Sequence, residues 1–367
     1  MKKSSRIISV LLLSLVTLLI VGILSFYLLI VVGLSPKLQT TWICSAMRTL
    51  NHKYLATWFF SDEYIDKIMD ENTIDDSEYE SDILDFSKPP ESTPLVTDQP
   101  DEEAPVVVEV DPYIEEGYEM LEEGLYLKTV SGTTWRGNMM LVTDPTRVKL
   151  VDTNRQYYCG EKVEMMINDV GGIAGINGGG FVDGANYDSN GGTPMGLIIE
   201  DYQLVCPTYA DNYSTYSIIG FNSSGAMILR HVTPQWALDN DIRSAVSALC
   251  FLVVNGEGLI GSASGGWGIA PRTAIGQRET GEVLMLVIDG RQVDWSIGCD
   301  LDVLEQVMLE EKAYNAAMLD GGTSTVMVYN NEFVNRPSNG IGRYINNCFV
   351  VMPIADSAET ADAVPAE

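Results

Sequence analysis

A run of 28 residues without a charge, from residue 7 to residue 34, restricts this chain more than any other feature. About 20 consecutive apolar residues suffice to cross a bilayer as a helix, and this run is longer. A cleaved secretory signal has a shorter apolar region, roughly 7–15 residues, and a small-residue cleavage site. Residues 33–36 are only a weak match to such a site. We therefore predict an uncleaved transmembrane signal anchor.

The basic residues before this run predict its orientation. Lys2, Lys3 and Arg6 favour a cytoplasmic N-terminal tip, within a first segment that ends at residue 35. The rest of the chain would then lie outside the cytoplasm, in a single-pass plasma-membrane protein. Six widely spaced cysteines could pair there, but their spacing selects no connectivity. Cys250 and Cys348 stand in apolar runs, so we expect buried free thiols.

The acidic residues are concentrated in one segment. The chain has 22 Lys and Arg against 51 Asp and Glu, and 21 of its 29 net negative charges fall between residues 61 and 123. This balance argues against nucleic-acid binding, which needs clustered basic residues. Residues 71–117 also contain several prolines and are predicted to be an acidic, extended linker. A cation-binding or partner-binding tail is the alternative, but no regular ligand spacing such as an EF-hand loop supports it.

The remaining segments differ in the spacing of their apolar residues and in the structure that this spacing predicts. Residues 36–70 carry apolar and aromatic residues at spacings that predict one or two short amphipathic helices beside the membrane. Residues 118–354 read as a folded domain, and residues 355–367 as a disordered tail. Many strand hairpins with two or three helices predict an α+β fold, with a mixed or antiparallel sheet core and a few packed helices.

Apolar runs separated by turn residues predict the individual elements. Residues 283–288 are fully apolar and are expected to be a central strand, residues 348–352 a last strand, and residues 161–170 and 300–317 helices. The expected hairpins join residues 138–143 to 147–151, 196–199 to 203–205, 217–221 to 226–229, 250–254 to 259–260, and 326–329 to 332–334.

Four loops combine glycine with groups that can do chemistry. They are Gly175–Phe181 (GINGGGF), Ala270–Gly276 (APRTAIG), Val287–Gln292 (VIDGRQ) and Met318–Thr325 (MLDGGTST). Glycine lets backbone amides approach an anion or a sugar, and an arginine before a strand can hold a phosphate. Each loop also has an ordinary interpretation as a tight turn, a surface arginine or an Asx-turn. The combination of all four favours a site.

Several classes of site are absent from the sequence. No P-loop, dinucleotide fingerprint, G-x-S-x-G elbow or H-E-x-x-H motif occurs. His231 has no recognisable partner, which argues against a serine hydrolase. No cofactor is predicted; Asp183, Asp289 and Asp320 could ligate a divalent cation, but no ligand spacing requires one.

Four segments of these loops, in this order, resemble the phosphodiester glycosidase family: Gly175–Phe181, Pro271–Gly276, Ile288–Gln292 and Leu319–Thr325. The resemblance covers about residues 120–353. Thr323 is a departure, since relatives commonly have Gly or Ser there. The resemblance implies hydrolysis of the sugar C1–O bond of a sugar-1-phosphodiester, such as an N-acetylglucosamine-1-phosphodiester, in surface glycans or glycoconjugates. Bacterial members are often anchored or secreted and associated with exopolysaccharide.

The resemblance also implies roles for particular residues. Asp320 or Asp289 would activate water or stabilise an oxocarbenium-like centre, and Arg272 with Arg291 would bind the phosphate. Which aspartate has which role stays open. The residues expected to be catalytic are Asp320, Asp289 and Arg272, and those expected to bind substrate are Asn177, Gly178, Gly179, Gly180, Gly290, Arg291, Gly321, Gly322, Thr323 and Ser324.

Two other functions fit the same residues. A non-catalytic module could bind phosphorylated glycans through the same arginines. An exopolysaccharide assembly factor would instead use residues 36–70 to bind a partner. The sequence leaves the oligomeric state open.

Overall fold

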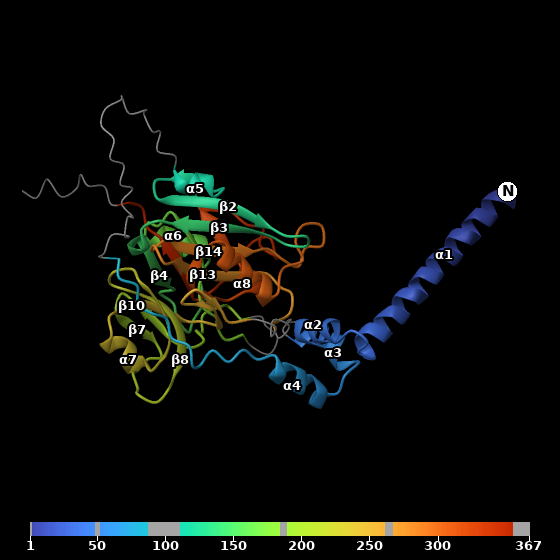
Figure 1. Ribbon diagram of the computed structural model, residues 1–367, viewed down its shortest axis with the longest axis horizontal. Coiled ribbons are helices and arrows are strands. Elements are labelled where there is room, and N and C mark those ends of the chain that lie inside the picture. The colour runs from blue at the N-terminus through green and yellow to red at the C-terminus, as the bar shows by residue number, and fades with distance from the viewer. Residues whose placement is uncertain (1, 48–51, 87–110, 184–188, 261–266, 355–367) are drawn as a thin grey trace, which may run out of the picture. The chain divides into compact units, whose positions relative to one another are not determined.

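The computed structural model describes residues 2–47, 52–86, 111–183, 189–260 and 267–354 (Figure 1). The chain forms two compact units. One comprises Met1–Ile74 with Gly261–Ile269, and the other Asp75–Ile260 with Ala270–Glu367. The predicted tail, and most of the predicted linker, lie outside the described residues.

The first unit begins with the apolar helix that the sequence predicts. Helix α1 (Lys2–Phe26) continues into a π-helical turn, η1 (Tyr27–Val31). Its 26-residue stretch Arg6–Val31 is long and apolar enough to cross a membrane. Because a signal sequence near an N-terminus has the same properties, the anchor itself stays a prediction.

Short helices follow, as predicted for residues 36–70. They are α2 (Pro36–Met47), α3 (Tyr54–Thr57) and α4 (Asp62–Glu71). Their apolar sides form a small core of Ile43, Cys44, Ala46, Ala56, Ile65 and Ile68.

The second unit is built on an antiparallel eight-stranded sheet with the order β1-β2-β3-β14-β13-β15-β11-β12. Strand β14 lies between β3 and β13, and all six of its residues are buried, which confirms the predicted central strand. The strands are β1 (Glu119–Glu122), β2 (Leu125–Ser131), β3 (Arg136–Val142), β11 (Cys250–Val254), β12 (Glu257–Gly258), β13 (Arg272–Arg278), β14 (Val283–Ile288) and β15 (Ala313–Met318).

Two antiparallel five-stranded sheets complete this unit, with the orders β7-β6-β10-β8-β9 and β17-β16-β5-β18-β4. One contains β6 (Ile198–Glu200), β7 (Gln203–Cys206), β8 (Tyr216–Asn222), β9 (Met227–Val232) and β10 (Ile242–Ser247). The other contains β4 (Val148–Asp152), β5 (Ala174–Asn177), β16 (Met327–Tyr329), β17 (Glu332–Phe333) and β18 (Asn347–Val351).

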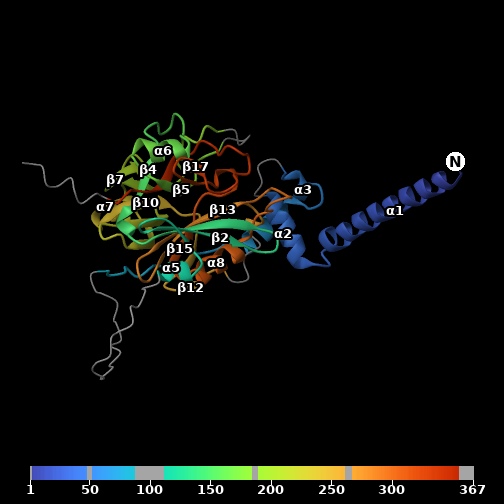
Figure 2. The ribbon, with the colours of Figure 1, turned by 90° about the horizontal axis from the view of Figure 1, so that it is seen from above.

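Few helices cover these sheets. Helix α6 (Val163–Asp169) packs on β4, β5 and β18, whereas α8 (Leu301–Glu310) packs on β11, β13 and β15 (Figures 1 and 2). Helix α7 (Pro234–Asp239) contacts β7 and β10. One apolar core joins all three sheets, with members such as Met140, Ile176, Phe221, Ile275 and Phe349. The predicted α+β class is therefore confirmed.

Most local predictions are confirmed. The hairpins β6–β7, β8–β9 and β16–β17 form as predicted, and so does β18. In the hairpin β11–β12, the positive φ angles of Asn255 (53°) and Gly256 (81°) place the turn earlier, so the second strand is Glu257–Gly258. Helix α6 ends before Gly171, whose φ of 68° suits glycine. All six cysteines lie in the described residues and are thiols, not disulfides, and Cys250 and Cys348 are buried as expected.

Two element predictions are wrong. Strands β3 and β4 do not form a hairpin, because β3 pairs with β2 and β14 while β4 pairs with β18. Between them, the 3₁₀ turn η2 (Pro145–Arg147), capped by Asp144, carries the chain from one sheet to another. The predicted helix 300–317 ends at Glu310, and a positive φ of 65° at Lys312 leads into β15. In β15, pairing with the neighbouring strands overrides the helix propensity of the alanines.

Both ends of the predicted linker are bound to the second unit. Near its start, Asp76 accepts a hydrogen bond from the main-chain N–H of Phe251 over 2.8 Å. Ser81 exchanges two 2.9 Å hydrogen bonds with the main chain of Leu229.

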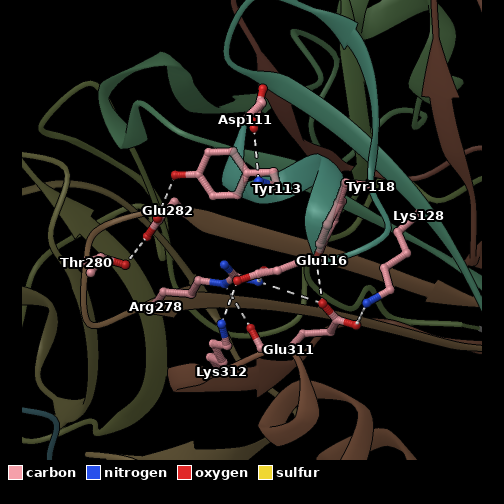
Figure 3. A network of polar contacts seen from close by, with 10 residues as sticks. All are labelled: Asp111, Tyr113, Glu116, Tyr118, Lys128, Arg278, Thr280, Glu282, Glu311 and Lys312. Atoms are coloured by element: carbon pink, nitrogen blue, oxygen red, sulfur yellow. Dashed lines mark hydrogen bonds and ion pairs between the residues drawn. The ribbon is translucent and has the colours of Figure 1, made fainter. Parts of the chain in front are cut away.

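A polar network holds the other end, which includes α5 (Pro112–Glu115) (Figure 3). Arg278, at the end of β13, donates to Glu116 over 2.8 Å and to the carbonyl of Glu311 over 2.9 Å. Tyr118 and Lys128 donate to the Glu311 carboxylate over 2.7 and 2.6 Å. Because buried charges are stable only when paired, these contacts fix residues 111–118 on the sheet.

Candidate functional site

The antiparallel order of three strands brings the predicted catalytic residues to one end of the eight-stranded sheet. Strand β13 begins at Arg272 and lies between β14, which ends before Asp289, and β15, which ends shortly before Asp320. The pairs Arg272↔Ile288 and Ala274↔Met318 set this register. An acid that leaves one strand therefore lies near an arginine that enters the next.

A second sheet reaches the same place through β5. The main-chain N–H of Asp320 donates to the carbonyl of Gly178 over 3.1 Å. The side-chain amide of Asn177 donates to the carbonyl of Asp320 over 2.6 Å. The glycine loop after β5 and the loop after β15 are thus joined.

Asn177 is fully buried, and its side chain is used by the fold. Its Oδ1 accepts from the hydroxyl of Thr273 over 2.8 Å and from the N–H of Val326 over 3.1 Å. The side chain therefore ties β5, β13 and the loop after β15 together. That Asn177 also contacts substrate, as expected from the sequence, stays a prediction.

The glycines of the site allow close approach of backbones. A Cβ atom on Gly178 would stand 2.0 Å from Oδ1 of Asn347, and one on Gly290 or Gly321 would stand 2.7 or 2.8 Å from Pro271. Gly322 has a φ of 64° and donates its N–H to the carbonyl of Pro271 over 2.9 Å. Side chains at these positions would push the loops apart.

The main chains of Gly179 and Gly180 also make hydrogen bonds within the protein. The N–H of Gly179 donates to Oδ1 of Asn347 over 2.7 Å, and the carbonyl of Gly180 accepts from the N–H of Met195 over 3.0 Å.

Among the acids of the four loops, Asp320 has an environment that favours protonation, as Asp152 and Glu200 have elsewhere in the chain. Burial raises the pKa of Asp320 to about 6, while a hydrogen bond from Ser324 and the charge of Arg343 oppose the shift. A carboxyl with a pKa near neutrality can exchange protons at working pH, as general acid–base catalysis requires.

Asp289 has a different environment, although it also follows a buried strand. Its carboxylate accepts hydrogen bonds from Trp295 Nε1 over 2.8 Å, from Asn335 Nδ2 over 2.9 Å and from the main-chain N–H of Arg336 over 3.1 Å. The residue is 2% exposed. These donors use the carboxylate to organise the surrounding loops.

The two predicted phosphate-binding arginines lie on separate strand ends. Arg272 is 4% exposed, and its Nε donates to the carbonyl of Cys299 over 3.4 Å. Arg291 donates through Nη1 to the hydroxyl of Thr323 over 3.1 Å, next to Asp320 in the loop after β15. Burial lowers the pKa of Arg291, and the charge of Asp320 acts in the opposite direction.

An ion pair between Arg343 and Asp183 adjoins this site and was not predicted from the sequence. Arg343 donates to both carboxylate oxygens of Asp183, over 2.8 and 3.0 Å, and its guanidinium lies 4.5 Å from the centre of the Phe181 ring. The charges of both residues act on the pKa of Asp320. No local motif indicates this pair, because 160 residues separate its members.

Three asparagines were missed as well. Asn346 and Asn347 are fully buried beside the glycine loop, and Asn335 supports Asp289. The sequence signal that could have indicated two of them is the pair Asn346-Asn347 just before the predicted strand 348–352. Amides that enter a buried strand need hydrogen-bond partners nearby.

Two of the three aspartates that could ligate a cation have other partners in the structure. Asp183 is paired with Arg343, and Asp289 with N–H donors. Within the described residues, no group of three His, Cys, Asp or Glu side chains could hold a metal ion.

His231 has partners that the sequence did not reveal. Its Nδ1 lies 3.1 Å from the hydroxyl of Ser217, and its Nε2 lies 3.2 Å from Oδ1 of Asp76. The hydroxyl is also 3.3 Å from Nε2. These contacts fix Asp76 beside strands β8 and β9.

Residues 171–352, which include all four motifs, match the phosphodiester glycosidase family. The chain contains a domain of this family. The resemblance inferred from the motifs is thereby confirmed, and the family supports a glycosidase-like hydrolase.

Two solved structures similar to this phosphodiester glycosidase domain have low sequence identity to it. The catalytic domain of zebrafish N-acetylglucosamine-1-phosphodiester α-N-acetylglucosaminidase, auto-inhibited by its pro-peptide, shares the fold, with a TM-score of 0.53 and 22% identity over 64% of this chain and 85% of that chain. A solved structure from Burkholderia pseudomallei has a TM-score of 0.46 and 15% identity, over 60% of this chain and 74% of that chain.

One similar curated protein is the SPbeta prophage-derived uncharacterized protein YomE of Bacillus subtilis (strain 168). It is 27% identical over 209 residues, which are 55% of this chain. The match spans only 30% of the length of that relative.

Proposed function

We propose that this domain hydrolyses the C1–O bond between a sugar and a phosphodiester. The family supports a glycosidase-like hydrolase, and the observation that carries the finer proposal is the raised pKa of Asp320, about 6, with Arg291 close enough for the charge of Asp320 to act on its pKa. Above this pKa, Asp320 is a carboxylate that can activate water or stabilise the oxocarbenium-like centre. A phosphodiester leaves as a stable anion, so strong help from a general acid is not required.

In this proposal the remaining residues bind and position the substrate. Arg272 and Arg291 neutralise the phosphate, since guanidinium groups match its geometry and charge. The glycine loops leave room for the sugar close to the backbone, and Thr323 orients Arg291. Asp289 has a supporting role, because N–H donors occupy its carboxylate.

We further propose that the domain acts outside the cytoplasm, on surface glycans or glycoconjugates, and is anchored through residues 7–34. The long apolar helix and the acidic linker support this placement. An N-acetylglucosamine-1-phosphodiester is the first substrate to test, because the zebrafish enzyme that shares the fold is named for it.

The test uses the full chain in detergent with two substrates, UDP-N-acetylglucosamine and the methyl phosphodiester of N-acetylglucosamine-1-phosphate. Free sugar is measured for the wild type, Asp320→Asn, Asp289→Asn and Arg272→Ala, each checked for folding. We expect release by the wild type and loss of at least 10²-fold in Asp320→Asn, as for removal of an acid–base group.

Binding of the substrates without turnover, across a panel of sugars, would contradict hydrolysis. It would leave a module that binds phosphorylated glycans.

A further inference from the structure

The loop between β14 and α8 connects the candidate site to two arginines at the surface. It begins beside Asp289 with Arg291 and reaches Trp295, whose indole N–H donates to Asp289 over 2.8 Å. The guanidinium of Arg136 lies 4.8 Å from the centre of the Trp295 ring, and that of Arg336 lies 5.9 Å from it. Cation–π contacts of this kind hold guanidinium groups in place.

Hydrogen bonds hold this loop in one conformation. Gln292 and Ser296 exchange main-chain hydrogen bonds of 2.8 and 2.9 Å, and the Ser296 hydroxyl donates to the carbonyl of Asp289 over 2.5 Å. The same hydroxyl accepts from the N–H of Arg136 over 3.1 Å. Asp289 also accepts from the main-chain N–H of Arg336. Both arginines are thus positioned by the aspartate that borders the site.

The charges of these arginines are weakly neutralised. Arg136 is exposed and has no carboxylate partner among the residues that the structure describes. Arg336 lies 3.6 Å from Asp294, but the two side chains are 53% and 77% exposed, and such a pair contributes little. A guanidinium stacked on a ring keeps N–H groups at its edge for an anion.

This positive patch stands out in a chain with a net charge of −29. Because 21 of these negative charges fall between residues 61 and 123, the rest of the chain is only mildly acidic, and two weakly neutralised arginines next to the loop that follows Arg291 would draw a negatively charged substrate to the site. In the proposed function, Arg272 and Arg291 bind the phosphate that leaves the sugar, so Arg136 and Arg336 are left for a second anionic group.

We propose that Arg136 and Arg336 form a second anion site that binds the neighbouring phosphate of a glycan with repeated phosphodiesters. The substrate class would then be a polymer of sugar phosphates, held at two successive phosphates and cut at one. This inference rests on the proposed function, because it extends the same site.

The experiment compares one sugar phosphodiester with three. The full chain in detergent is given the methyl phosphodiester of N-acetylglucosamine-1-phosphate, or a synthetic trimer of phosphodiester-linked N-acetylglucosamine. In the wild type we expect a lower KM for the trimer. In Arg136→Gln or Arg336→Gln, the ratio of the trimer KM to the single-unit KM should rise about fivefold, the effect of losing one exposed charge-assisted contact.

Lys149→Gln is the matched control, because it removes one exposed positive charge on β4, outside the loops of the site. It should keep the wild-type ratio. Should the arginine variants fail to fold, salt provides the test in the wild type. Raising the ionic strength should then increase the KM of the trimer more than that of the single unit.

Equal responses of both substrates to the arginine variants would overturn the proposal and leave the proposed function intact. The alternative is that the two arginines bind free phosphate and make no contact with a polymer, and calorimetry with inorganic phosphate tests it. Such a site would lose phosphate affinity in Arg136→Gln while the KM ratio stays constant, which also overturns the proposal.

If the wild type cleaves neither substrate, the proposed function fails, and binding of the trimer decides the inference. Affinity about fivefold weaker in Arg136→Gln would support the second anion site, and equal affinity would overturn it.

Discussion

The side-chain amide of Asn177 donates to the main-chain carbonyl of Asp320 over 2.6 Å and so joins the end of β5 to the loop after β15. Two sheets meet at this bond, and the candidate catalytic carboxyl group takes its position from it. Asn177 also accepts from Thr273 and Val326, so all its contacts are with the protein.

Removing these contacts should affect both folding and turnover. Asn177→Ala leaves buried polar groups unpaired and is expected to lower the free energy of unfolding by about 3 kcal/mol. In urea unfolding, the exposed Asn168→Ala should change it by less than about 0.5 kcal/mol. A small effect of Asn177→Ala with full sugar release would show that Asp320 is positioned by other contacts.

The pH dependence of turnover follows from the raised pKa of Asp320. If its carboxylate form acts, kcat/KM for sugar release should rise with pH and level off above an apparent pKa of about 6. Rates measured from pH 4.5 to 8 test this. A profile that falls through pH 6 would mean that the protonated form acts, as a general acid.

The same shift has a consequence for stability. Burial places the pKa of Asp320 at about 6 in the folded chain, against 3.8 ordinarily, so unfolding releases a proton between these values and stability falls as pH rises through this window. Asp320→Asn should therefore stabilise the protein at pH 7, by at most about 3 kcal/mol. In urea unfolding the gain should vanish near pH 3.5. A gain of equal size at both pH values would have another cause than the charge.

Local signals in the sequence predicted most of the fold. Turn residues such as Asn222 to Gly225 mark hairpins whose strands are neighbours in the chain. The four loops could be recognised as a set because each carries its glycine next to its polar residue. Three of these loops lie close together because β13 begins, and β14 and β15 end, at the same end of the sheet.

Long-range pairing could not be predicted in this way. Strands β3 and β4 are separated by a short turn, yet their partners β14 and β18 lie far along the chain. The strand Ala313–Met318 has a composition that suits a helix, and only its place between β13 and β11 decides its conformation. For the same reason, the partners of Asn177 and Arg343 are visible only in the folded structure.

Asp289 should prove to be a positioning residue. Asp289→Asn replaces an acceptor oxygen by an amide that faces N–H donors, so at least one of the bonds from Trp295, Asn335 and Arg336 is lost. We expect a loss of about 2 kcal/mol in stability and a smaller loss of kcat than in Asp320→Asn. Thermal unfolding and sugar release measure the two effects. A loss of kcat equal to that of Asp320→Asn, in a folded variant, would assign Asp289 to the chemistry.

The network around Arg278 (Figure 3) should contribute strongly to stability. It lies at the opposite end of β13 from Arg272. Arg278 is 4% exposed, and its loss leaves Glu311 short of a positive charge, so Arg278→Ala should lower the free energy of unfolding by about 3 kcal/mol. Lys312 binds Glu116 in the same network, but its side chain is 65% exposed. Lys312→Ala should therefore cost less than about 1 kcal/mol in urea unfolding. Equal losses in the two variants would mean that burial does not set the strength of this network.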